Sequence, residues 1–401
     1  MKFDPATNIQ QLSAFGEFGG VNPSITDSST YTFFKSETMK ELFESEIEGC
    51  FLYSRHWNPS NKYLSDAISA LENSEASQIT SSGMSAIACT ILQICQQGDQ
   101  IISSRTIYGG TYAFFKNILP RYGITVKFVD IANLNDVDSN INSKSKLIYC
   151  ESISNPLLEV ADIPSLSKIA KKNAIKLVVD NTFSPMSITP INLGADVVIH
   201  SLTKFINGTS DCVAGSISSN KNFISNLSDV NSGMCMLLGP VLDSFRSASI
   251  LKNIHTLHIR IKKHSENAQF ICEELESSGI KVMYPGLKSH PNHLLMKTIM
   301  NTQYGFGGIL AIDLIKEELA ESLMEKMQEQ NVGLLAVSLG YFKTLFSLPG
   351  NSTSSEISDE DQMKMGLSKG IIRLSIGIDN NIHHSLDKMI NCMTNLKILK
   401  K

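Results

Sequence analysis

The sequence predicts an α/β fold in which helices cover both faces of a mostly parallel central sheet. Between residues 84 and 217, short apolar runs of strand length alternate with segments of helical periodicity. The strand-like runs are 100–104, 125–130, 146–152, 176–182, 196–201 and 212–217, and the helix-like segments include 84–96, 110–121 and 163–173. Repetition of strand, helix and strand is typical of parallel sheets, and the continuous apolar run at 197–199 fits a strand buried on both faces.

Local signals place the helices and divide the chain into three parts. Leu64, Ile68 and Leu71 have helical spacing, and Asp162 with Pro164 supplies good start chemistry for the helix at 163–173. Residues 241–280 are expected to form one long helix that leads into a smaller domain of mixed α and β structure. We therefore expect an N-terminal arm at 1–60 that contacts a neighbouring subunit, a large domain at 61–255 and a C-terminal domain at 256–401.

Composition excludes several classes of protein. Hydrophobic residues make up 42% of the 401 residues and charged residues 18%, which suits a full core and excludes a disordered chain. The net charge of −4 gives no general field for nucleic acid or an anionic membrane. No secretory signal is expected at the polar N-terminus, and no apolar run approaches the roughly 20 residues of a membrane helix. The eight scattered cysteines predict reduced thiols and a cytoplasmic protein.

The residues that follow the predicted strands carry chemistry. Ligands of parallel sheets bind beyond the carboxyl ends of the strands, where Glu151, Asp180 and Lys204 stand. A lysine in the tail of an apolar strand is costly unless it is neutralised, paired or covalently bound. Lys204 could form a Schiff base with an aldehyde cofactor while Asp180 pairs with a protonated ring nitrogen, as pyridoxal phosphate requires. The alternative is a solvated lysine in an ordinary loop.

Three segments could hold a phosphate group. Ser201 and Thr203 place two hydroxyls beside Lys204. The turn at 80–85, which contains Ser82, Gly83 and Met84, feeds a helix whose N-terminus offers free N–H groups and a positive dipole, or forms an ordinary cap. Arg55 could clamp a phosphate with two hydrogen bonds, or it could be an ordinary surface arginine.

Four further residues could face a planar cofactor and its substrate. Tyr108 could lie flat on the cofactor ring or simply close a glycine turn, and Asn155 could bond to a ring oxygen or start a turn before Pro156. Arg373 stands inside an apolar strand-like run and must meet an anion there. That anion could be a substrate α-carboxylate, with Ser338 as a second ligand, or a carboxylate of the protein.

The motifs together resemble one family. SRHWNP, SSGMSA, YGGT, ESISNP, VVDNTFSP, SLTKF, AVSLG and IIRLSIG occur in this order, and they look like the Cys/Met metabolism family of pyridoxal-phosphate enzymes, of the aspartate-aminotransferase-like fold type I. The resemblance runs from about residue 15 to 380. Within the family, the sequence most resembles the plant-type methionine γ-lyases, through EFGGVNPSI, HSLTKFINGTSD, YPGLKSHPNH, YGFGGIL and SLPGNSTSSE.

The resemblance implies a role for each candidate residue. Lys204 would carry pyridoxal phosphate, Asp180 would pair with the ring nitrogen, Tyr108 would stack on the ring and act as an acid, and Asn155 would contact the ring oxygen. The phosphate would be held by Ser82, Gly83, Met84, Ser201 and Thr203, and by Tyr53 and Arg55 of a neighbouring subunit. Arg373 and Ser338 would bind the carboxylate of a small sulfur amino acid. The resemblance also implies a homotetramer built from two dimers.

The implied reaction is that of a carbon–sulfur lyase, which converts L-methionine into methanethiol, 2-oxobutanoate and ammonia. Two positions depart from the family pattern. Gly110 stands where some bacterial methionine γ-lyases have a cysteine, and Lys343 stands where related γ-lyases often have an acidic residue. Substrate preference is therefore the open part, and cystathionine γ-lyase, cystathionine γ-synthase and O-acetylhomoserine sulfhydrylase are the alternatives.

Three hypotheses from other classes are weaker. A cofactor-binding protein without turnover would not need a carboxylate clamp such as Arg373. A nucleotide-binding oxidoreductase would need a third spaced glycine after residues 305–308 and an acidic residue at the expected distance. The two histidine pairs at 255 and 258 and at 290 and 293 lack a cysteine or carboxylate at metal spacing, so we expect no metal site.

Overall fold

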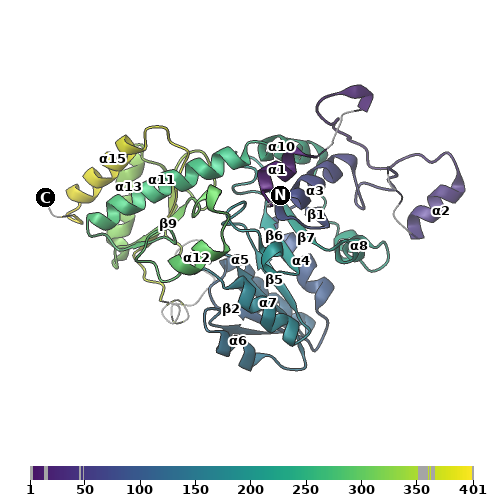
Figure 1. The fold of residues 1–401 in the computed structure, drawn as a ribbon, viewed down its shortest axis with the longest axis horizontal. Coiled ribbons are helices and arrows are strands. Elements are labelled where there is room, and N and C mark those ends of the chain that lie inside the picture. The colour runs from purple at the N-terminus through teal and green to yellow at the C-terminus, as the bar shows by residue number, and fades with distance from the viewer. Residues whose placement is uncertain are drawn as a thin grey trace.

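The computed structural model describes residues 3–12, 17–44, 47, 49–350, 360, 362 and 366–399. Most of the SLPGNSTSSE segment lies outside these residues. The chain forms two sheets, each covered by helices, and an arm near the N-terminus that projects away from both (Figure 1). In the described part of the chain, no helix combines the length and the hydrophobicity that a membrane span requires.

The larger sheet has seven strands in the order β1-β7-β6-β5-β4-β2-β3. Their bounds along the sheet are β1 Ala76–Thr80, β7 Gly215–Ser219, β6 Val197–Ser201, β5 Lys176–Asp180, β4 Ser145–Glu151, β2 Gln100–Ser104 and β3 Thr125–Val129. Only β7 runs against its neighbours, and the other paired strands are parallel. The predicted α/β fold with a mostly parallel central sheet is confirmed.

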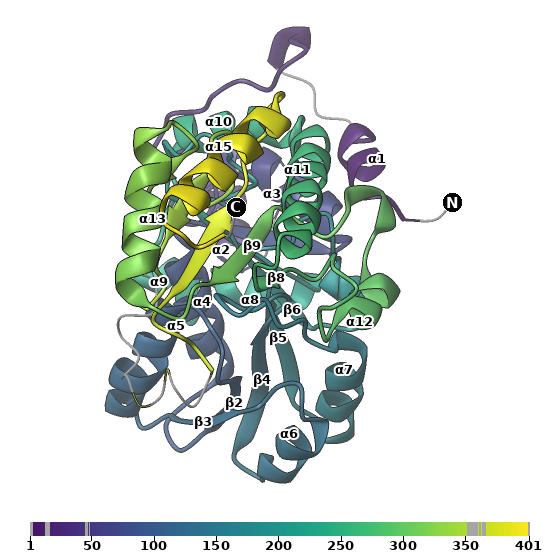
Figure 2. The ribbon, with the colours of Figure 1, turned by 90° about the vertical axis from the view of Figure 1, so that its left-hand side faces the viewer.

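Alternating side chains bury both faces of this sheet. Val178 and Ile199 pack on one face beside helix α4 (Gly83–Ile94), whereas Val179 and Val198 pack on the other face beside α3 (Pro59–Glu72) and α7 (Ile163–Lys172). Figure 2 shows β4 and β5 between α4 and α5 on one side and α7 on the other. A strand with apolar residues at every position is stable only in such a sandwich, which explains the run at 197–199.

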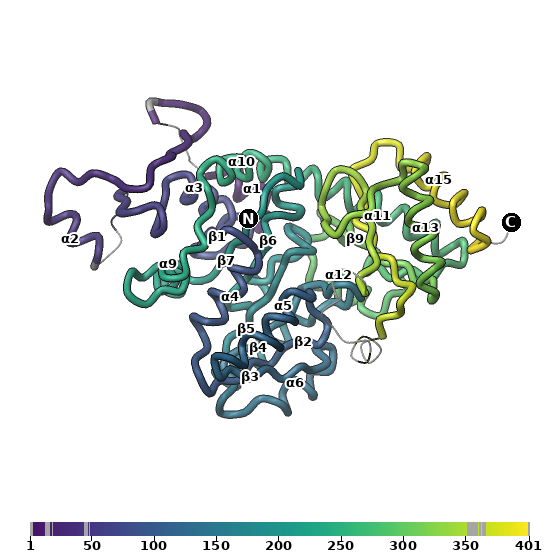
Figure 3. Tube along the Cα trace, turned by 180° about the vertical axis from the view of Figure 1, so that it is seen from behind, coloured from purple at the N-terminus to yellow at the C-terminus, as the bar shows by residue number. Residues whose placement is uncertain are grey.

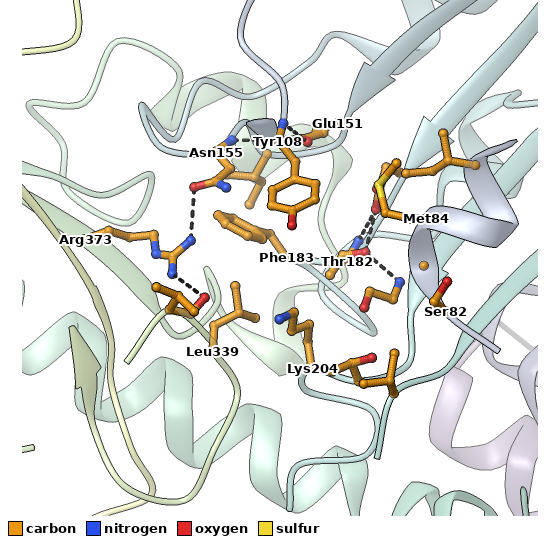
Figure 4. Close-up of a pocket in the computed structure, with 18 residues that line it drawn as sticks. Ser82, Met84, Tyr108, Glu151, Asn155, Thr182, Phe183, Lys204, Leu339 and Arg373 are labelled. Atoms are coloured by element: carbon orange, nitrogen blue, oxygen red, sulfur yellow. Dashed lines mark hydrogen bonds between the residues drawn. The ribbon is translucent and has the colours of Figure 1, made fainter. Parts of the chain in front are cut away.

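The smaller sheet is mostly antiparallel and carries its helices on one face. Its order is β10 Leu334–Leu335, β11 Leu345–Ser347, β12 Ile371–Ser375, β9 Ile309–Asp313 and β8 Val282–Met283. Ile372 and Leu374 of β12 belong to the core that this sheet shares with α11 (Leu257–Ser277), α13 (Glu317–Glu329) and α15 (Ile382–Asn395). Side chains alternate along a strand, so Arg373 projects from the opposite face, toward the larger sheet (Figure 4).

The structure differs from the predicted elements at four places, three of which lie in the larger sheet and its connections. Strand β1 was not expected, because ASQIT is polar; its Ser77 hydroxyl is satisfied by that of Ser218 at 2.8 Å. The last strand begins at Gly215, three residues later than expected. The segment 110–121 is a short α5 (Gly109–Ala113), a π turn (Phe114–Ile118) and a 3-10 turn (Leu119–Tyr122), since Pro120 cannot donate to a regular helix.

The expected long helix at 241–280 is two helices. Two residues separate the end of helix α10 (Ser244–Ile254) from the start of α11. Arg260, in the first turn of α11, reaches back across the break, where its Nη2 donates to the carbonyl oxygens of Ile206 at 2.9 Å and Asn253 at 3.0 Å. The break falls at the predicted domain boundary of 255 and 256. The division itself stays a prediction, because Met296 and Ile309 from beyond the boundary pack in the core of the larger sheet.

The remaining helices lie at the margins. They are α1 Pro5–Gln10, α2 Ser36–Glu44, α6 Leu134–Asn140, α8 Lys221–Ser228, α9 Met234–Leu238 and α12 His293–Ile299. Helix α1 packs against α3, whereas α2 lies at the far end of the arm (Figure 3). In the arm, Val21 and Phe34 are fully exposed, so this segment has little core of its own in the single chain.

Candidate active site

A cavity of about 410 Å³ lies at the carboxyl ends of the central strands, beneath β12 of the smaller sheet (Figure 4). Its volume is within the range of small-molecule sites. Many of the predicted residues line it: Ser82, Gly83, Met84, Tyr108, Asn155, Asp180, Ser201, Thr203, Lys204 and Arg373. Residues that come from positions 82 to 373 of the sequence are thus brought to one place by the fold.

Lys204 follows β6 in a tight turn and points its amine into the cavity. The Nζ atom donates to the Ser338 hydroxyl at 3.3 Å, so Ser338 also belongs to the site. Burial, with a smaller contribution from the charge of Arg373, lowers the pKa of Lys204 to about 8. An amine with such a pKa is partly neutral near physiological pH, and the neutral form is the nucleophile and base.

Asp180 ends β5 on the wall opposite the smaller sheet. Its Oδ1 accepts hydrogen bonds from the Thr182 backbone N–H at 3.0 Å and the Thr182 hydroxyl at 2.6 Å. The Thr182 Oγ1 in turn accepts from the Ser201 N–H at 2.8 Å. Burial raises the pKa of Asp180, and no lysine, arginine or histidine of the described residues forms an ion pair with it. The carboxylate is therefore held in place without a cation of its own.

The start of α4 lies against the end of β6. Ser82 caps the helix by accepting from the Ser85 N–H at 3.0 Å, and the Ser82 N–H donates to the Ser85 hydroxyl at 3.0 Å. The first-turn amides of Gly83 and Met84 have no partner within the helix, as in any helix. A Cβ atom at Gly83 would lie 2.8 Å from the Ser201 Cβ, so glycine permits this close approach. Free amides, a helix dipole and the nearby Ser201 and Thr203 side chains suit a phosphate.

Arg373 lies on the central strand β12 and is 2% exposed. Its Nη1 donates to Asn155 Oδ1 at 3.2 Å, and its Nη2 donates to the Ser338 carbonyl at 3.3 Å and to the Ser347 hydroxyl at 3.4 Å. Its Nε has no partner, and no carboxylate of the described residues pairs with the guanidinium. Burial lowers the pKa of Arg373 to about 10. Within the described part of the single chain the guanidinium forms no structural ion pair, and the role of Arg373 stays a prediction.

Tyr108 precedes α5 and reaches over the cavity (Figure 4). A Cβ atom at Gly110 would lie 2.6 Å from Cε1 of the Tyr108 ring. Gly110 therefore allows the position that the ring takes here, and a side chain at 110 would move the ring. Lys343 is exposed, with its Nζ 5.8 Å from the centre of the Phe342 ring, and it does not line the cavity.

Tyr53 and Arg55 lie away from the cavity in the single chain. The Arg55 Nη1 donates to the Met236 carbonyl at 3.1 Å, and its guanidinium carbon is 5.5 Å from the centre of the Tyr53 ring. Tyr53 is 43% exposed. The structure thus does not bring these two residues to the other predicted phosphate ligands of the same chain.

Several cavity residues were missed from the sequence. They are Ile87, Ile153, Thr182, Phe183, Val213, Val337 and Leu339, and Glu151 was noticed at its strand end without a role. The position of Thr182, two residues after an acid at the end of a buried strand, was an available signal. The apolar members carry no local signal, because any buried side chain has the same residue types.

The residues present fit pyridoxal phosphate. The cavity offers a desolvated amine for an aldehyde, a buried unpaired carboxylate for a ring nitrogen, and a helix start with hydroxyls for a phosphate. Asp180 ends β5, Lys204 follows the adjacent strand β6, and the start of α4 lies against the end of β6. The three features are therefore neighbours at one edge of the sheet.

A family model supports the same conclusion. The model described as "Cys/Met metabolism PLP-dependent enzyme" matches residues 6–388. The chain belongs to this family. Pyridoxal phosphate is accordingly its cofactor, as the resemblance implied, and the fold is that of the family's known structures.

Relatives within the family differ in activity. The chain is 42% identical to the methionine γ-lyase of Arabidopsis thaliana, over 93% of this chain and 86% of the relative. It is 35% identical to a cystathionine γ-lyase of Dictyostelium discoideum, over 84% and 87% of the two chains.

Solved structures agree in fold. A protein described as an O-acetylhomoserine (thiol)-lyase from Campylobacter jejuni, which contains a pyridoxyl-lysine monophosphate, is 28% identical with a TM-score of 0.90, over 98% of this chain and all of that one. The cystathionine γ-lyase of Lactobacillus plantarum, complexed with L-serine, is also 28% identical, with a TM-score of 0.89 over 99% and 100%.

Proposed function

We propose that this protein is a methionine γ-lyase, which converts L-methionine and water into methanethiol, 2-oxobutanoate and ammonia. The observation that carries the proposal is the shared cavity of Lys204, Asp180 and Arg373, whose guanidinium meets no carboxylate among the described residues. The 42% identity to a methionine γ-lyase supports this choice of substrate within the family. The Cγ–S and Cα–N bonds break, and the departing sulfur takes up a proton.

Nine residues of the cavity have a proposed role in holding the cofactor. Lys204 would bind the aldehyde through its amine, Asp180 would face the ring nitrogen, Tyr108 would stack on the ring and Asn155 would contact the ring oxygen. Ser82, Gly83, Met84, Ser201 and Thr203 would hold the phosphate. When bound, pyridoxal phosphate supplies an electron sink for negative charge at the α-carbon.

The chain's own groups would bind methionine and move its protons. Arg373 would hold the α-carboxylate with its fork of donors, and Ser338 would assist. The Lys204 amine, with its lowered pKa, would accept the α-proton, and the Tyr108 hydroxyl would protonate the leaving sulfur. Val213, Val337 and Leu339 give the cavity an apolar part that suits a thioether.

The assembly and the location of the protein are also proposals. We propose a homotetramer in which Tyr53 and Arg55 complete the phosphate site of a neighbouring subunit. This is supported by the separation of both residues from the cavity of their own chain and by the exposed apolar side chains of the arm. A cytoplasmic location is supported by eight cysteines that are all free thiols.

A comparison of substrates tests the proposed activity. The purified holoenzyme is offered methionine, homocysteine, cysteine, cystathionine and O-acetylhomoserine, and every product is identified. We expect methanethiol and 2-oxobutanoate from methionine at the highest kcat/KM. Cystathionine γ-lyase is the second candidate, because a relative with that activity is 35% identical. Preferred turnover of cystathionine or of the acylated substrate would contradict the proposal.

A further inference from the structure

Glu151 is a buried acid in the cavity to which the proposed chemistry gives no task. It ends β4, where it pairs in register with Asp180 of β5, and it is 7% exposed. Figure 4 shows its carboxylate beside Tyr108 at the edge of the cavity. Burial, followed by the charge of Asp180, raises the pKa of Glu151 to about 8. An acid is costly at such a position, and a neutral side chain of the same size would avoid that cost.

The contacts of Glu151 point to the use of its two oxygens. Oε1 accepts a hydrogen bond from the Tyr108 backbone N–H at 2.7 Å, and Oε2 accepts from the Asn155 backbone N–H at 2.8 Å. Tyr108 belongs to the turn after β2, whereas Asn155 belongs to the loop after β4. One carboxylate therefore joins two loops that are 47 residues apart, since Asn155 and Tyr108 differ by that number.

The connection extends to the proposed substrate clamp. The Asn155 side-chain oxygen accepts from the Arg373 Nη1 at 3.2 Å. Tyr108, Asn155 and Arg373 come from three separate segments, and Glu151 bonds directly to the backbone of two of them. A carboxyl group can present one acceptor oxygen to each of two converging N–H groups even when it holds a proton, because that proton can point away from both, whereas an amide must turn its NH₂ group toward one of them.

We propose that Glu151 is a positioning residue that fixes Tyr108 and the Asn155–Arg373 pair relative to one another, and so aligns the cofactor ring with the substrate carboxylate. This inference rests on the proposed function, in that it takes the cavity to hold pyridoxal phosphate and an amino acid. It assigns no contact between Glu151 and the reacting atoms.

Two substitutions distinguish this positioning role from two simpler ones, in which Glu151 only fills space or only supplies a negative charge. Glu151→Gln keeps the size of the side chain but turns an NH₂ group toward one of the two backbone donors. Glu151→Asp keeps the charge but is one methylene shorter, so it can reach at most one of the two loops. Glu159→Gln is the matched control: Glu159 lies on the same loop, bonds to the Thr106 hydroxyl at 2.7 Å and does not line the cavity.

The test compares these holoenzymes by cofactor content, visible circular dichroism of the bound cofactor, kcat and KM for methionine, and thermal midpoint. We expect Glu151→Gln to retain the cofactor and to lose at least half of the visible dichroism. We expect kcat to fall about 10- to 100-fold, which is the rate ratio that corresponds to the free-energy cost of one unsatisfied buried donor if that cost raises the activation barrier. Glu151→Asp should change the dichroism and kcat in the same direction. Glu159→Gln should keep both.

Other outcomes would overturn the proposal. If Glu151→Gln kept the wild-type dichroism and kcat, the Glu151 side chain would only fill space in the packed interior. If Glu151→Asp kept the wild-type dichroism and kcat while Glu151→Gln lost them, the role of Glu151 would be to supply charge. If Glu159→Gln lost as much dichroism and kcat as Glu151→Gln, the effect would come from the stability of the loop. The dichroism does not depend on which sulfur compound is the substrate. Failure of the methionine assay would therefore leave this readout intact and count against the proposed function alone.

Discussion

The two walls of the cavity carry opposite charges but obey the same electrostatic rule. On the large-sheet wall, burial is the largest influence on Glu151 and Asp180 and raises the pKa of both. On the wall formed by the β6 turn and β12, burial is again the largest influence and lowers the pKa of Lys204 and Arg373. Loss of solvation therefore outweighs attraction between the walls, which are held too far apart to form ion pairs among the described residues.

This comparison indicates what the cavity is built to receive. Charges that are buried without partners are costly, and they persist where a ligand supplies the missing counter-charge. A molecule with a protonated ring nitrogen would suit the acidic wall, and a molecule with a carboxylate would suit Arg373. Pyridoxal phosphate and an amino acid together bring both groups.

The largest expected effect comes from removing the amine of the basic wall. Lys204→Ala should abolish the visible absorbance of the lysine-bound cofactor and lower kcat at least about a thousandfold, because both the proposed attachment point and the proposed base are lost. Absorbance spectroscopy and product assays measure this. A variant that kept the wild-type band would show that another amine holds the cofactor.

Removing the charge of the acidic wall should have the next largest effect. Asp180→Asn keeps an oxygen for the Thr182 donors but cannot neutralise a ring nitrogen, so we expect kcat to fall about 100-fold. The visible spectrum of the holoenzyme should change with the protonation of the ring. An unchanged spectrum together with an unchanged kcat would remove Asp180 from the proposed site.

A smaller effect is expected for the other cation. Arg373→Lys keeps the positive charge but loses the two-pronged geometry, so KM for methionine should rise about tenfold or more while cofactor content stays unchanged. Steady-state kinetics and cofactor titration separate the two quantities. An equal rise in KM for an amine that lacks the carboxylate would contradict the role of Arg373.

The smallest effect is a pH dependence of stability in the cofactor-free protein. The pKa of Glu151 is raised from 4.5 to about 8, so the folded state holds its proton longer, and stability should fall as pH rises from 4.5 to 8. The pKa of Lys204 is lowered from 10.5 to about 8, so the unfolded state holds more protons above pH 8, and stability should rise from 8 to 10.5. Stability should therefore pass through a minimum near pH 8.

Urea unfolding across this pH range measures the two slopes. Glu151→Gln should flatten the decrease below pH 8, and Lys204→Met should flatten the increase above pH 8. If Glu151→Gln left the slope of stability against pH below pH 8 unchanged, and Lys204→Met left the slope above pH 8 unchanged, the opposite pKa shifts of the two walls would be contradicted.

The sequence carried most of the information on the larger sheet and on the polar part of the site. The apolar runs around Val178 and Val198 predicted buried parallel strands, and the residues that follow such strands must meet at one edge. This reasoning, together with the motifs, gave Asp180, Lys204 and Ser201. Strand β1 was missed, because the partners of its polar Ser77, which include Ser69 of α3 and Ser218 on a strand far along the chain, cannot be seen in the sequence of the strand itself.

The sequence by itself determined the fold class, the family and the cofactor, because strand periodicity and short motifs are local properties of the chain. Only the tertiary structure decided that Arg373 meets no carboxylate among the described residues, that Lys343 does not line the cavity, and that Glu151 joins the Tyr108 and Asn155 loops. The surroundings of Arg373 are set where the two sheets pack, and the contacts of Glu151 are set where neighbouring strands of the larger sheet end. Desolvation and pairing are set by that packing, and no local pattern records them.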